Sequence, residues 1–380
     1  MRVCLNALHF VPGKMGGVET YLRELIRTMP LVGGAEDSIV IYTNSKYLEA
    51  FSTNTIIPIE HAKIYERPDP RWLVRAVLRK SIGIDLYATA LSKIKADILH
   101  YPFTVMAPLV TNKPTVLTFW DMQHEFYPEF FSKKEIGYRA AVYRKSVQKA
   151  TRIIVSSAFT KRCLTERYGV DAAKIDVVYT GYAPDFQVMG DAEDVIRCHG
   201  VERPFMYYPA ATWPHKNHAL LLDALRLLID RWGFDGILVL SGISMQQDSA
   251  ILERIRTLAL ENYVKILGYL PYSELPYFYN AARLMVFPSL FEGFGIPLVE
   301  AMACGCPVVA ADCTSIPEVV GSAGRLFDPG SAEALAENIW SLWNNDTELQ
   351  AMSEKGLQRA ACFTWRETAL ATLQAYRKLL

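Results

Sequence analysis

Two glutamates, Glu292 and Glu300, lie eight positions apart in the stretch FPSLFEGFGIPLVEAMACGCPVVAAD, residues 287–312. The apolar residues before Glu292 predict a buried strand, and the residues from Pro297 onward predict a helix, because proline favours the first helical turn. The glycines between them predict a loop. A strand, a loop and a helix N-terminus together form an anion-binding site, because unpaired N–H groups and the helix dipole face the loop. The pattern therefore predicts phosphate binding beside two carboxylates.

These two carboxylates can address different parts of one ligand. Glu300 lies about one turn inside the predicted helix, whereas Glu292 lies ahead of its first residue. A sugar nucleotide has a matching layout: its phosphates would meet the helix N-terminus, its ribose one carboxylate, and its sugar the other. The spacing alone leaves an alternative open, in which Glu292 caps the helix and Glu300 is solvated.

Length and composition indicate two domains. The chain has 380 residues, 51% of them apolar, and single cores stop growing at roughly 250 to 300 residues. Residues 1–185 carry 25 Lys and Arg against 18 Asp and Glu, and the remainder carries 15 against 22. This asymmetry suggests an anionic partner for the first half, although scattered solvated charge gives the same numbers.

The cysteine pattern and the lengths of the apolar runs indicate the cellular compartment of the protein. Seven cysteines without disulfide or zinc-site spacing fit a reducing compartment. The sequence contains neither a signal-peptide pattern nor a run of about 18 apolar residues. We therefore expect a cytoplasmic protein.

Short β-branched runs alternate with helical patterns, which indicates parallel α/β sheets covered on both faces. A polar passage with Pro184, Gly190 and Pro204 is the expected linker between two such sheets. We expect strands at residues 3–8, 39–43, 98–101, 115–119, 153–156 and 176–179, and then at 205–209, 237–241, 265–267, 284–288 and 307–311.

The opening stretch, with PEVVGSAGRLFDP downstream, resembles the signature of family 4 retaining glycosyltransferases. Their GT-B fold has two Rossmann-like α/β domains facing across a cleft. Further pieces follow in family order, among them GKMGGVETYLREL, YPAATWPHKNHALLLDAL and VKILGYLP, and the resemblance is thinner between residues 45 and 110. It implies an acceptor-side domain at 1–185, a nucleotide-sugar-binding domain at 200–362, and a C-terminal helix at 363–380 that crosses back to the first domain.

The resemblance also assigns the donor site. In the family the first glutamate, here Glu292, contacts the transferred sugar, and the second, here Glu300, binds the ribose. The lysine of PHKN, Lys216, pairs with the diphosphate and neutralises the leaving group; an exposed structural lysine is the alternative. Further donor-binding positions implied by the resemblance are Gly268, Tyr269, Leu270, Phe294, Gly295 and Ile296.

One family residue of the donor site is absent. Ala211 occupies the place of an arginine that is common five positions before the lysine. Thr212 or His215 could substitute for this second phosphate clamp.

In the first half, the family loop that matches GKMGGVE covers the β-phosphate, which points to Gly16 and Gly17. A tight turn without a ligand has the same glycines. Many relatives read His-Asp where this chain has Trp120 and Asp121. His124 could replace the missing histidine or could be a loop residue, whereas Asp121 at a strand end would be costly without a partner.

The implied activity is hexose transfer with retention at the anomeric carbon, in which the leaving diphosphate takes the acceptor proton. The expected catalytic residues are Asp121, His124, Lys216 and Glu292. The chain contains no Asp-x-Asp, and we expect no metal and no other cofactor.

The expected donor is a UDP-sugar such as UDP-glucose, with GDP-mannose next. The expected acceptor is a polysaccharide or lipid-linked glycan, and no nucleic acid is involved. Two alternatives are a GT-B-fold sugar-nucleotide epimerase and a non-catalytic sugar-nucleotide-binding protein. A dinucleotide oxidoreductase would need Gly-x-Gly-x-x-Gly after the first strand, which GKMGGVE does not supply.

A basic segment could place the protein at the inner face of a membrane. In RWLVRAVLRKSIG, Arg71, Arg75 and Arg79 share one helical stripe with Lys80 nearby. Such a segment could lie on anionic lipid, or it could pack its apolar face on its own domain.

Overall fold

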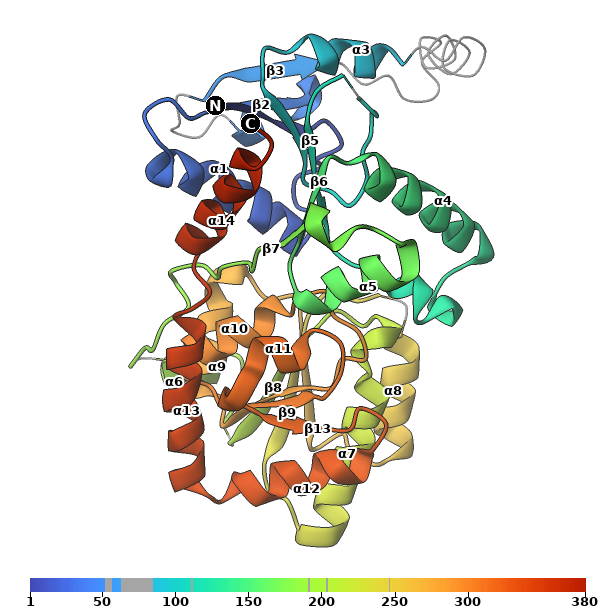
Figure 1. The fold of residues 1–380 in the computed structure, drawn as a ribbon. Coiled ribbons are helices and arrows are strands. Elements are labelled where there is room, and N and C mark those ends of the chain that lie inside the picture. The colour runs from blue at the N-terminus through green and yellow to red at the C-terminus, as the bar shows by residue number, and fades with distance from the viewer. Residues whose placement is uncertain (52–56, 63–84, 111, 191, 203, 246) are drawn as a thin grey trace. The chain divides into compact units, whose positions relative to one another are not determined.

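The structure is a computed structural model that describes residues 1–51, 57–62, 85–110, 112–190, 192–202, 204–245 and 247–380. The basic segment from Arg71 to Lys80 lies outside the described residues. The chain divides into two compact units, the first made of Met1–Thr180 with Trp365–Leu380 and the second of Gly181–Thr364. Each unit contains one parallel sheet with helices around it (Figure 1).

The first unit has a seven-stranded sheet in the order β3-β2-β1-β4-β5-β6-β7. The chain runs outward from β1 to β3 and then returns to the other side of β1, so the topological switch point lies between β1 and β4. The strands are β1 Arg2–Ala7, β2 Ser38–Asn44, β3 Ile59–Ala62, β4 Ile98–Tyr101, β5 Thr115–Phe119, β6 Arg152–Val155 and β7 Ile175–Val177. The helices are α1 Gly17–Val32, η1 Ser45–Phe51, α3 Leu86–Lys93, η2 Gln123–Glu125, η3 Pro128–Phe130, α4 Lys133–Lys149, α5 Ala158–Tyr168, η4 Ala172–Lys174 and α14 Trp365–Arg377.

Both faces of this sheet are buried. Successive residues of β1 belong to different apolar clusters: Val3 and Leu5 pack on one face and Cys4 on the other. The C-terminal helix α14, red in Figure 1, packs against α1, which is blue. Its Tyr376 hydroxyl lies 2.6 Å from Nδ1 of the buried His100. The final helix is therefore part of the core of the first unit.

The second unit has a six-stranded sheet in the order β10-β9-β8-β11-β12-β13, with its switch point between β8 and β11. The strands are β8 Phe205–Pro209, β9 Ile237–Ser241, β10 Val264–Gly268, β11 Leu284–Phe287, β12 Val308–Ala311 and β13 Arg325–Phe327. The helices are α6 Ala192–Cys198, η5 Pro214–Lys216, α7 His218–Trp232, α8 Asp248–Thr257, η6 Tyr272–Glu274, α9 Leu275–Ala281, α10 Ile296–Ala303, α11 Ile316–Val320, η7 Gly321–Ala323, α12 Ala332–Trp343 and α13 Asp346–Ala360.

The eleven strands expected from sequence are all present within a residue or two of the expected bounds, and β3 and β13 are additional. Within the described ranges, no helix has the length and apolar character needed to cross a bilayer.

Candidate functional site

The loop after β11 leads into α10 through a glycine with positive φ. Gly295 has φ 103° and ψ 56°, and a Cβ atom there would lie 3.0 Å from Cδ1 of Leu298. Helix α10 begins at Ile296 with Pro297 in its first turn and has no side-chain cap. Its N-terminal N–H groups and dipole therefore offer an uncapped site for an anion.

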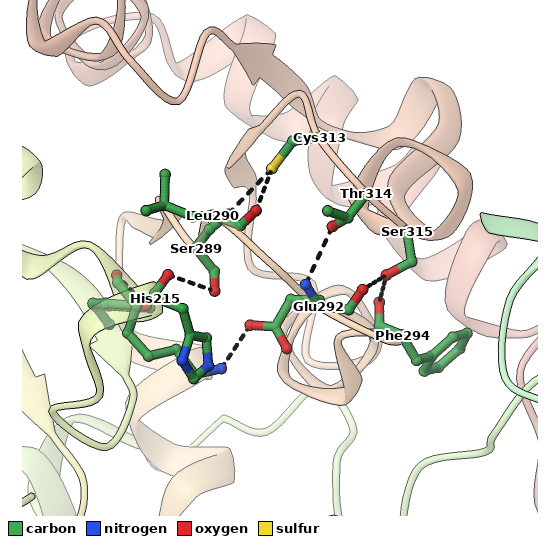
Figure 2. Close-up of polar contacts among 10 residues, drawn as sticks. His215, Ser289, Leu290, Glu292, Phe294, Cys313, Thr314 and Ser315 are labelled. Carbon is green, nitrogen blue, oxygen red and sulfur yellow. Dashed lines mark hydrogen bonds and ion pairs between the residues drawn. The ribbon is translucent and has the colours of Figure 1, made fainter. Parts of the chain in front are cut away.

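This loop is held in place by the segment before α11. Ser315 Oγ donates to the carbonyl oxygens of Glu292 and Phe294, both at 3.0 Å (Figure 2). The backbone N–H of Glu292 donates to Thr314 Oγ1 at 3.2 Å. The backbone of Glu292 is thus fixed on both sides, which leaves its carboxylate to point away from the loop.

The Glu292 carboxylate forms an ion pair with Lys216. Lys216 Nζ donates to Glu292 Oε1 at 2.6 Å, and the two side chains are 16% and 14% exposed. Burial by itself would raise the pKa of Glu292, but the charge of Lys216 and its hydrogen bond lower it below its ordinary value. The structure thus brings together two expected site residues that lie 76 positions apart in the sequence.

Lys216 ends η5 and is anchored through its backbone. Its carbonyl oxygen accepts a hydrogen bond from Tyr208 Oη at 2.8 Å. The next residue, Asn217, has a left-handed φ of 56° and donates to the carbonyls of Pro288 and Pro329, both at 3.2 Å. The turn after β8 and the loop after β11 are therefore tied together at the switch point of the sheet.

The two possible substitutes for the absent arginine are His215 and Thr212. His215 is largely buried, and burial with the adjacent Lys216 charge lowers its pKa to about 4, so it is neutral at pH 7. Its carbonyl accepts from the backbone N–H of Leu290 at 2.8 Å. Thr212 donates to Asp248 and accepts from the Met245 N–H at 2.7 Å. Neither residue adds a positive charge at this site.

Glu300 is buried inside the second unit rather than solvated. It is 4% exposed, and its carboxylate accepts hydrogen bonds from Tyr272 Oη at 2.7 Å and Tyr279 Oη at 3.3 Å. Burial raises the pKa of Glu300 to about 7, although the two tyrosine hydrogen bonds act in the opposite direction. The alternative of a capping Glu292 and a solvated Glu300 is therefore wrong.

A cavity of about 320 Å³ lies at the carboxyl ends of β8, β9 and β10, and Gly268 and Tyr269 form part of its wall. Gly242 follows β9, and its N–H donates to the carbonyl of Gly268 at 2.8 Å. A Cβ atom on Gly242 would lie 2.4 Å from the carbonyl oxygen of Ala210, so only glycine fits. Leu270 is buried beside this cavity wall rather than forming it.

The remaining expected residues belong to the first unit. Gly16, with φ 53°, precedes α1, which begins at Gly17 without a side-chain cap. Asp121 accepts from the N–H of Gln123 at 3.2 Å. His124 is 2% exposed, and its Nε2 lies 3.4 Å from Tyr168 Oη.

The ring of His124 packs edge-on against Phe131 and Tyr143. Burial lowers the pKa of His124, so its ring is a neutral part of an aromatic cluster. The structure does not expose this histidine to a ligand, and its catalytic role stays a prediction.

Sequence reasoning missed Tyr272, Tyr279, Thr314 and Ser315. No local pattern marks them, because each contacts a glutamate that lies at least 21 positions away. Among the described residues, no group of three or more His, Cys, Asp or Glu side chains could hold a metal ion.

Comparisons with known proteins agree over nearly the whole chain. The model of Glycosyltransferase Family 4 matches residues 15–186, and that of Glycosyl transferases group 1 matches residues 196–359. The chain is 27% identical over 374 residues to O-antigen chain mannosyltransferase B of Escherichia coli, with 96% of each chain covered. It is 29% identical over 259 residues to D-inositol 3-phosphate glycosyltransferase of Nocardia farcinica, covering 65% of this chain and 56% of the relative.

Two solved structures show the same fold. Anabaena HepE in complex with UDP and glucose superposes with a TM-score of 0.76 at 21% identity, covering 100% of both chains. WaaG, a glycosyltransferase involved in lipopolysaccharide biosynthesis, superposes with a TM-score of 0.69 at 16% identity, covering 99% of this chain and 98% of WaaG. At these identities the likeness concerns the fold alone.

Proposed function

We propose that this chain, which belongs to glycosyltransferase family 4 and has the GT-B fold, transfers a hexose from a nucleotide-diphosphate sugar to a glycan acceptor. The observation that carries this proposal is the 2.6 Å ion pair between Lys216 and Glu292 beside the uncapped N-terminus of α10. A cation, a carboxylate and a set of N–H groups converge there, as a charged sugar donor requires.

Each part of the donor has a matching group in the second unit. The diphosphate lies against the N–H groups of Gly295 and Ile296 and takes Lys216 as its counter-ion. The carboxylate of Glu292 accepts hydrogen bonds from hydroxyls of the transferred sugar. The carboxylate of Glu300 accepts from the ribose, and its two tyrosine partners, Tyr272 and Tyr279, hold it in place.

The charge of the leaving diphosphate is neutralised by the protein itself in this proposal. Lys216 supplies a full positive charge, and the start of α10 supplies a partial one of about half an elementary charge. Transfer should then proceed in the presence of a metal chelator. A requirement for an added divalent ion would contradict this part of the proposal.

Transfer is proposed to retain the anomeric configuration. The acceptor hydroxyl oxygen attacks on the face that the diphosphate leaves, the bond from the anomeric carbon to the diphosphate oxygen breaks, and the hydroxyl proton passes to the departing diphosphate. Glu292 is not the nucleophile here, because its carboxylate is held by Lys216 and serves as a hydrogen-bond acceptor. Gly16, Gly17 and Asp121 are assigned to the approach of the acceptor and the β-phosphate.

The transferred sugar is proposed to be mannose. The sequence by itself favours a UDP-sugar as the donor, with GDP-mannose next. The relative that matches 96% of the chain is an O-antigen chain mannosyltransferase, which favours a mannosyl donor. The same relative supports a surface polysaccharide, or its lipid-linked precursor, as the acceptor.

The test is a transfer assay with the purified full chain. GDP-mannose, UDP-glucose and ADP-glucose are each incubated with mannose-terminated oligosaccharides that carry an apolar aglycone, and the new linkage is read by proton NMR. An α-linked mannoside from the α-linked donor supports the proposal. A β-linked product would contradict retention, and conversion of the donor without acceptor would identify an epimerase instead. Binding of the donor without any turnover would identify a binding protein.

A further inference from the structure

The cavity at the carboxyl ends of β8, β9 and β10 contains one unusual residue. Its described wall is mostly aliphatic and small, with Leu240, Ile251 and Ile266 among its members. Asp248, the first residue of α8, is the one member of that described wall with a formal charge at neutral pH. His218 also lines the cavity, but it is neutral at pH 7. Its burial, together with the smaller effect of the Lys216 charge, lowers its pKa to about 4.

The carboxylate of Asp248 has hydrogen-bond partners on one oxygen. Its Oδ1 accepts from the hydroxyl of Thr212 and from the N–H of Met245 at 3.3 Å. Among the described residues, Asp248 forms no ion pair. Both partners are neutral, so the charge at the cavity wall is not compensated by a cation. Asp248 is partly buried at the start of α8, and a ligand in the cavity that donates to its second oxygen would gain a hydrogen bond to a charged group.

This cavity adjoins the groups proposed to bind the donor. His218 in its wall follows Lys216 by two positions. On the other side, Gly268 and Tyr269 lead directly into η6, where Tyr272 donates to Glu300. A ligand with its diphosphate at Lys216 and its ribose at Glu300 therefore has its base at this cavity. The volume of about 320 Å³ suits a base rather than a complete sugar nucleotide.

A carboxylate in such a cavity discriminates between bases. Guanine presents two adjacent donors, N1–H and the exocyclic 2-amino group, which can both point at one carboxylate oxygen, here the Oδ2 that Thr212 and Met245 leave free. Uracil places its single N3–H between two carbonyl oxygens, which would repel the carboxylate. Adenine has an acceptor ring nitrogen next to its amino group, so it lacks a second adjacent donor for the carboxylate. Of these three bases, guanine alone offers two adjacent donors to the free oxygen of this carboxylate.

We propose that this cavity binds guanine and that Asp248 is the residue that selects it over uracil and adenine. The inference rests on the proposed function, because it assigns the base of the same donor. The phenol of Tyr269, which is 69% exposed, lies at the cavity and is positioned to cover the base. The donor is then a guanosine-diphosphate sugar, and its sugar is chosen at Glu292 rather than here.

The experiment measures dissociation constants by calorimetry for GDP, IDP, UDP and ADP with the full chain. IDP lacks only the 2-amino group of guanine, so it removes one of the two donors that face Asp248. We expect the wild-type chain to bind GDP at least about tenfold more tightly than IDP, since hydrogen bonds to charged groups contribute about 1.5–3 kcal/mol. UDP and ADP should bind more weakly still.

The variant Asp248→Asn keeps a carbonyl oxygen for Thr212 and Met245 and removes the charge. In this variant the difference between GDP and IDP should shrink to about twofold or less, mainly through weaker GDP binding. The matched control is Asp230→Asn, on α7, whose carboxylate is exposed and paired with Arg226. That control should keep the wild-type ratio.

The outcomes separate the inference from the function. If GDP and IDP bind the wild-type chain equally, or if Asp248→Asn keeps the wild-type ratio, Asp248 does not read guanine and the inference is wrong. If UDP binds more tightly than GDP, the inference is wrong and the proposed function survives. If none of the nucleotides binds, the proposed function itself fails. The GDP and IDP comparison needs no variant, so a folding defect in Asp248→Asn does not obscure it.

Discussion

Lys216 Nζ and Glu292 Oε1 lie 2.6 Å apart and join the turn after β8 to the loop after β11. These two strands flank the switch point of the second sheet, where ligands of open α/β sheets bind. In the free chain each charge neutralises the other. A bound diphosphate would share the ammonium group, which would release the Glu292 carboxylate toward the sugar.

Lys216→Ala should destabilise the second unit and weaken nucleotide binding together. It leaves Glu292 largely buried without its cation, which costs about 3 kcal/mol when one partner of a buried pair is removed. Thermal melting and calorimetric titration with GDP and UDP would measure the two effects. Lys355→Ala, at an exposed position of α13, is the matched control and should change neither.

The double variant Lys216→Ala, Glu292→Gln separates the two effects. It removes the unpaired carboxylate, so it should melt at a higher temperature than Lys216→Ala alone while binding nucleotide just as weakly. If the double variant also recovers nucleotide binding, Lys216 does not act on the diphosphate.

Glu292→Gln should lower turnover more than donor affinity. The amide keeps the shape of the side chain but offers a weaker acceptor to the sugar hydroxyls as charge develops on the sugar ring. We expect kcat to fall by about 100-fold and the dissociation constant of the nucleotide to change by less than about threefold. Single-turnover transfer and calorimetry measure these quantities. Wild-type turnover in this variant would exclude Glu292 from the site.

The strands of both units could be predicted because the sheets are buried on both faces. Most inner strands are largely apolar runs, as in β8 and β9, and such runs stand out in the sequence. The two strands that the sequence did not indicate, β3 and β13, are at sheet edges. Polar residues interrupt their apolar character, Glu60 and His61 in β3 and Arg325 in β13.

The candidate site could be predicted only in part. Glu292 and Glu300 are visible through their spacing around one loop, and Lys216 through its resemblance to a family motif. The burial of Glu300 was not visible, because Tyr272 and Tyr279 come from η6 and α9. The same holds for His124, whose partners Tyr143 and Tyr168 come from α4 and α5. Contacts between distant segments leave no local pattern.

Glu300→Gln should remove a pH dependence of stability. In the folded chain the pKa of Glu300 is raised to about 7 from 4.5, so the folded state holds a proton that the unfolded state releases. The contribution of Glu300 to stability therefore decreases as the pH rises from about 4.5 to about 7. Glutamine still accepts from Tyr272 and Tyr279 but does not ionise. Relative to wild type, the free energy of unfolding of the variant should rise by roughly 3 kcal/mol as the pH rises across this window.

Melting temperatures of both proteins at steps between about pH 5 and pH 8 test this. Glu337→Gln, at an exposed position of α12, serves as the control and should give a difference independent of pH. A difference for Glu300→Gln that is also independent of pH would contradict a raised pKa. The ribose contact is tested separately. The wild-type chain should bind 2′,3′-dideoxy-GDP more weakly than GDP, whereas the Glu300→Gln variant should bind the two nucleotides equally.

Gly295→Ala should disturb the anion site through the backbone. The glycine has φ 103°, a value that residues with a Cβ atom rarely adopt, and the new methyl group would meet Leu298 at 3.0 Å. We expect a loss of about 1–3 kcal/mol in stability and about tenfold weaker nucleotide binding, because the start of α10 must shift. Gly190→Ala is the control, since a Cβ there meets no atom within 4 Å. Unchanged nucleotide binding in Gly295→Ala would argue against a role for this helix terminus.

Substitutions of Asp121 and His124 should have different effects on kcat and on the melting temperature, although the two residues lie only three positions apart. The ring of His124 is 2% exposed within an aromatic cluster, and burial lowers its pKa, so it is placed to support the loop rather than to contact substrate. His124→Phe should therefore lower the melting temperature and leave kcat within about threefold of wild type. Asp121→Asn keeps an acceptor for the Gln123 N–H and should lower kcat by about tenfold or more with an unchanged melting temperature. Thermal melting and steady-state transfer assays measure both. A large fall in kcat for His124→Phe at wild-type stability would contradict this prediction. It would indicate that His124 replaces the family histidine that is absent from this chain.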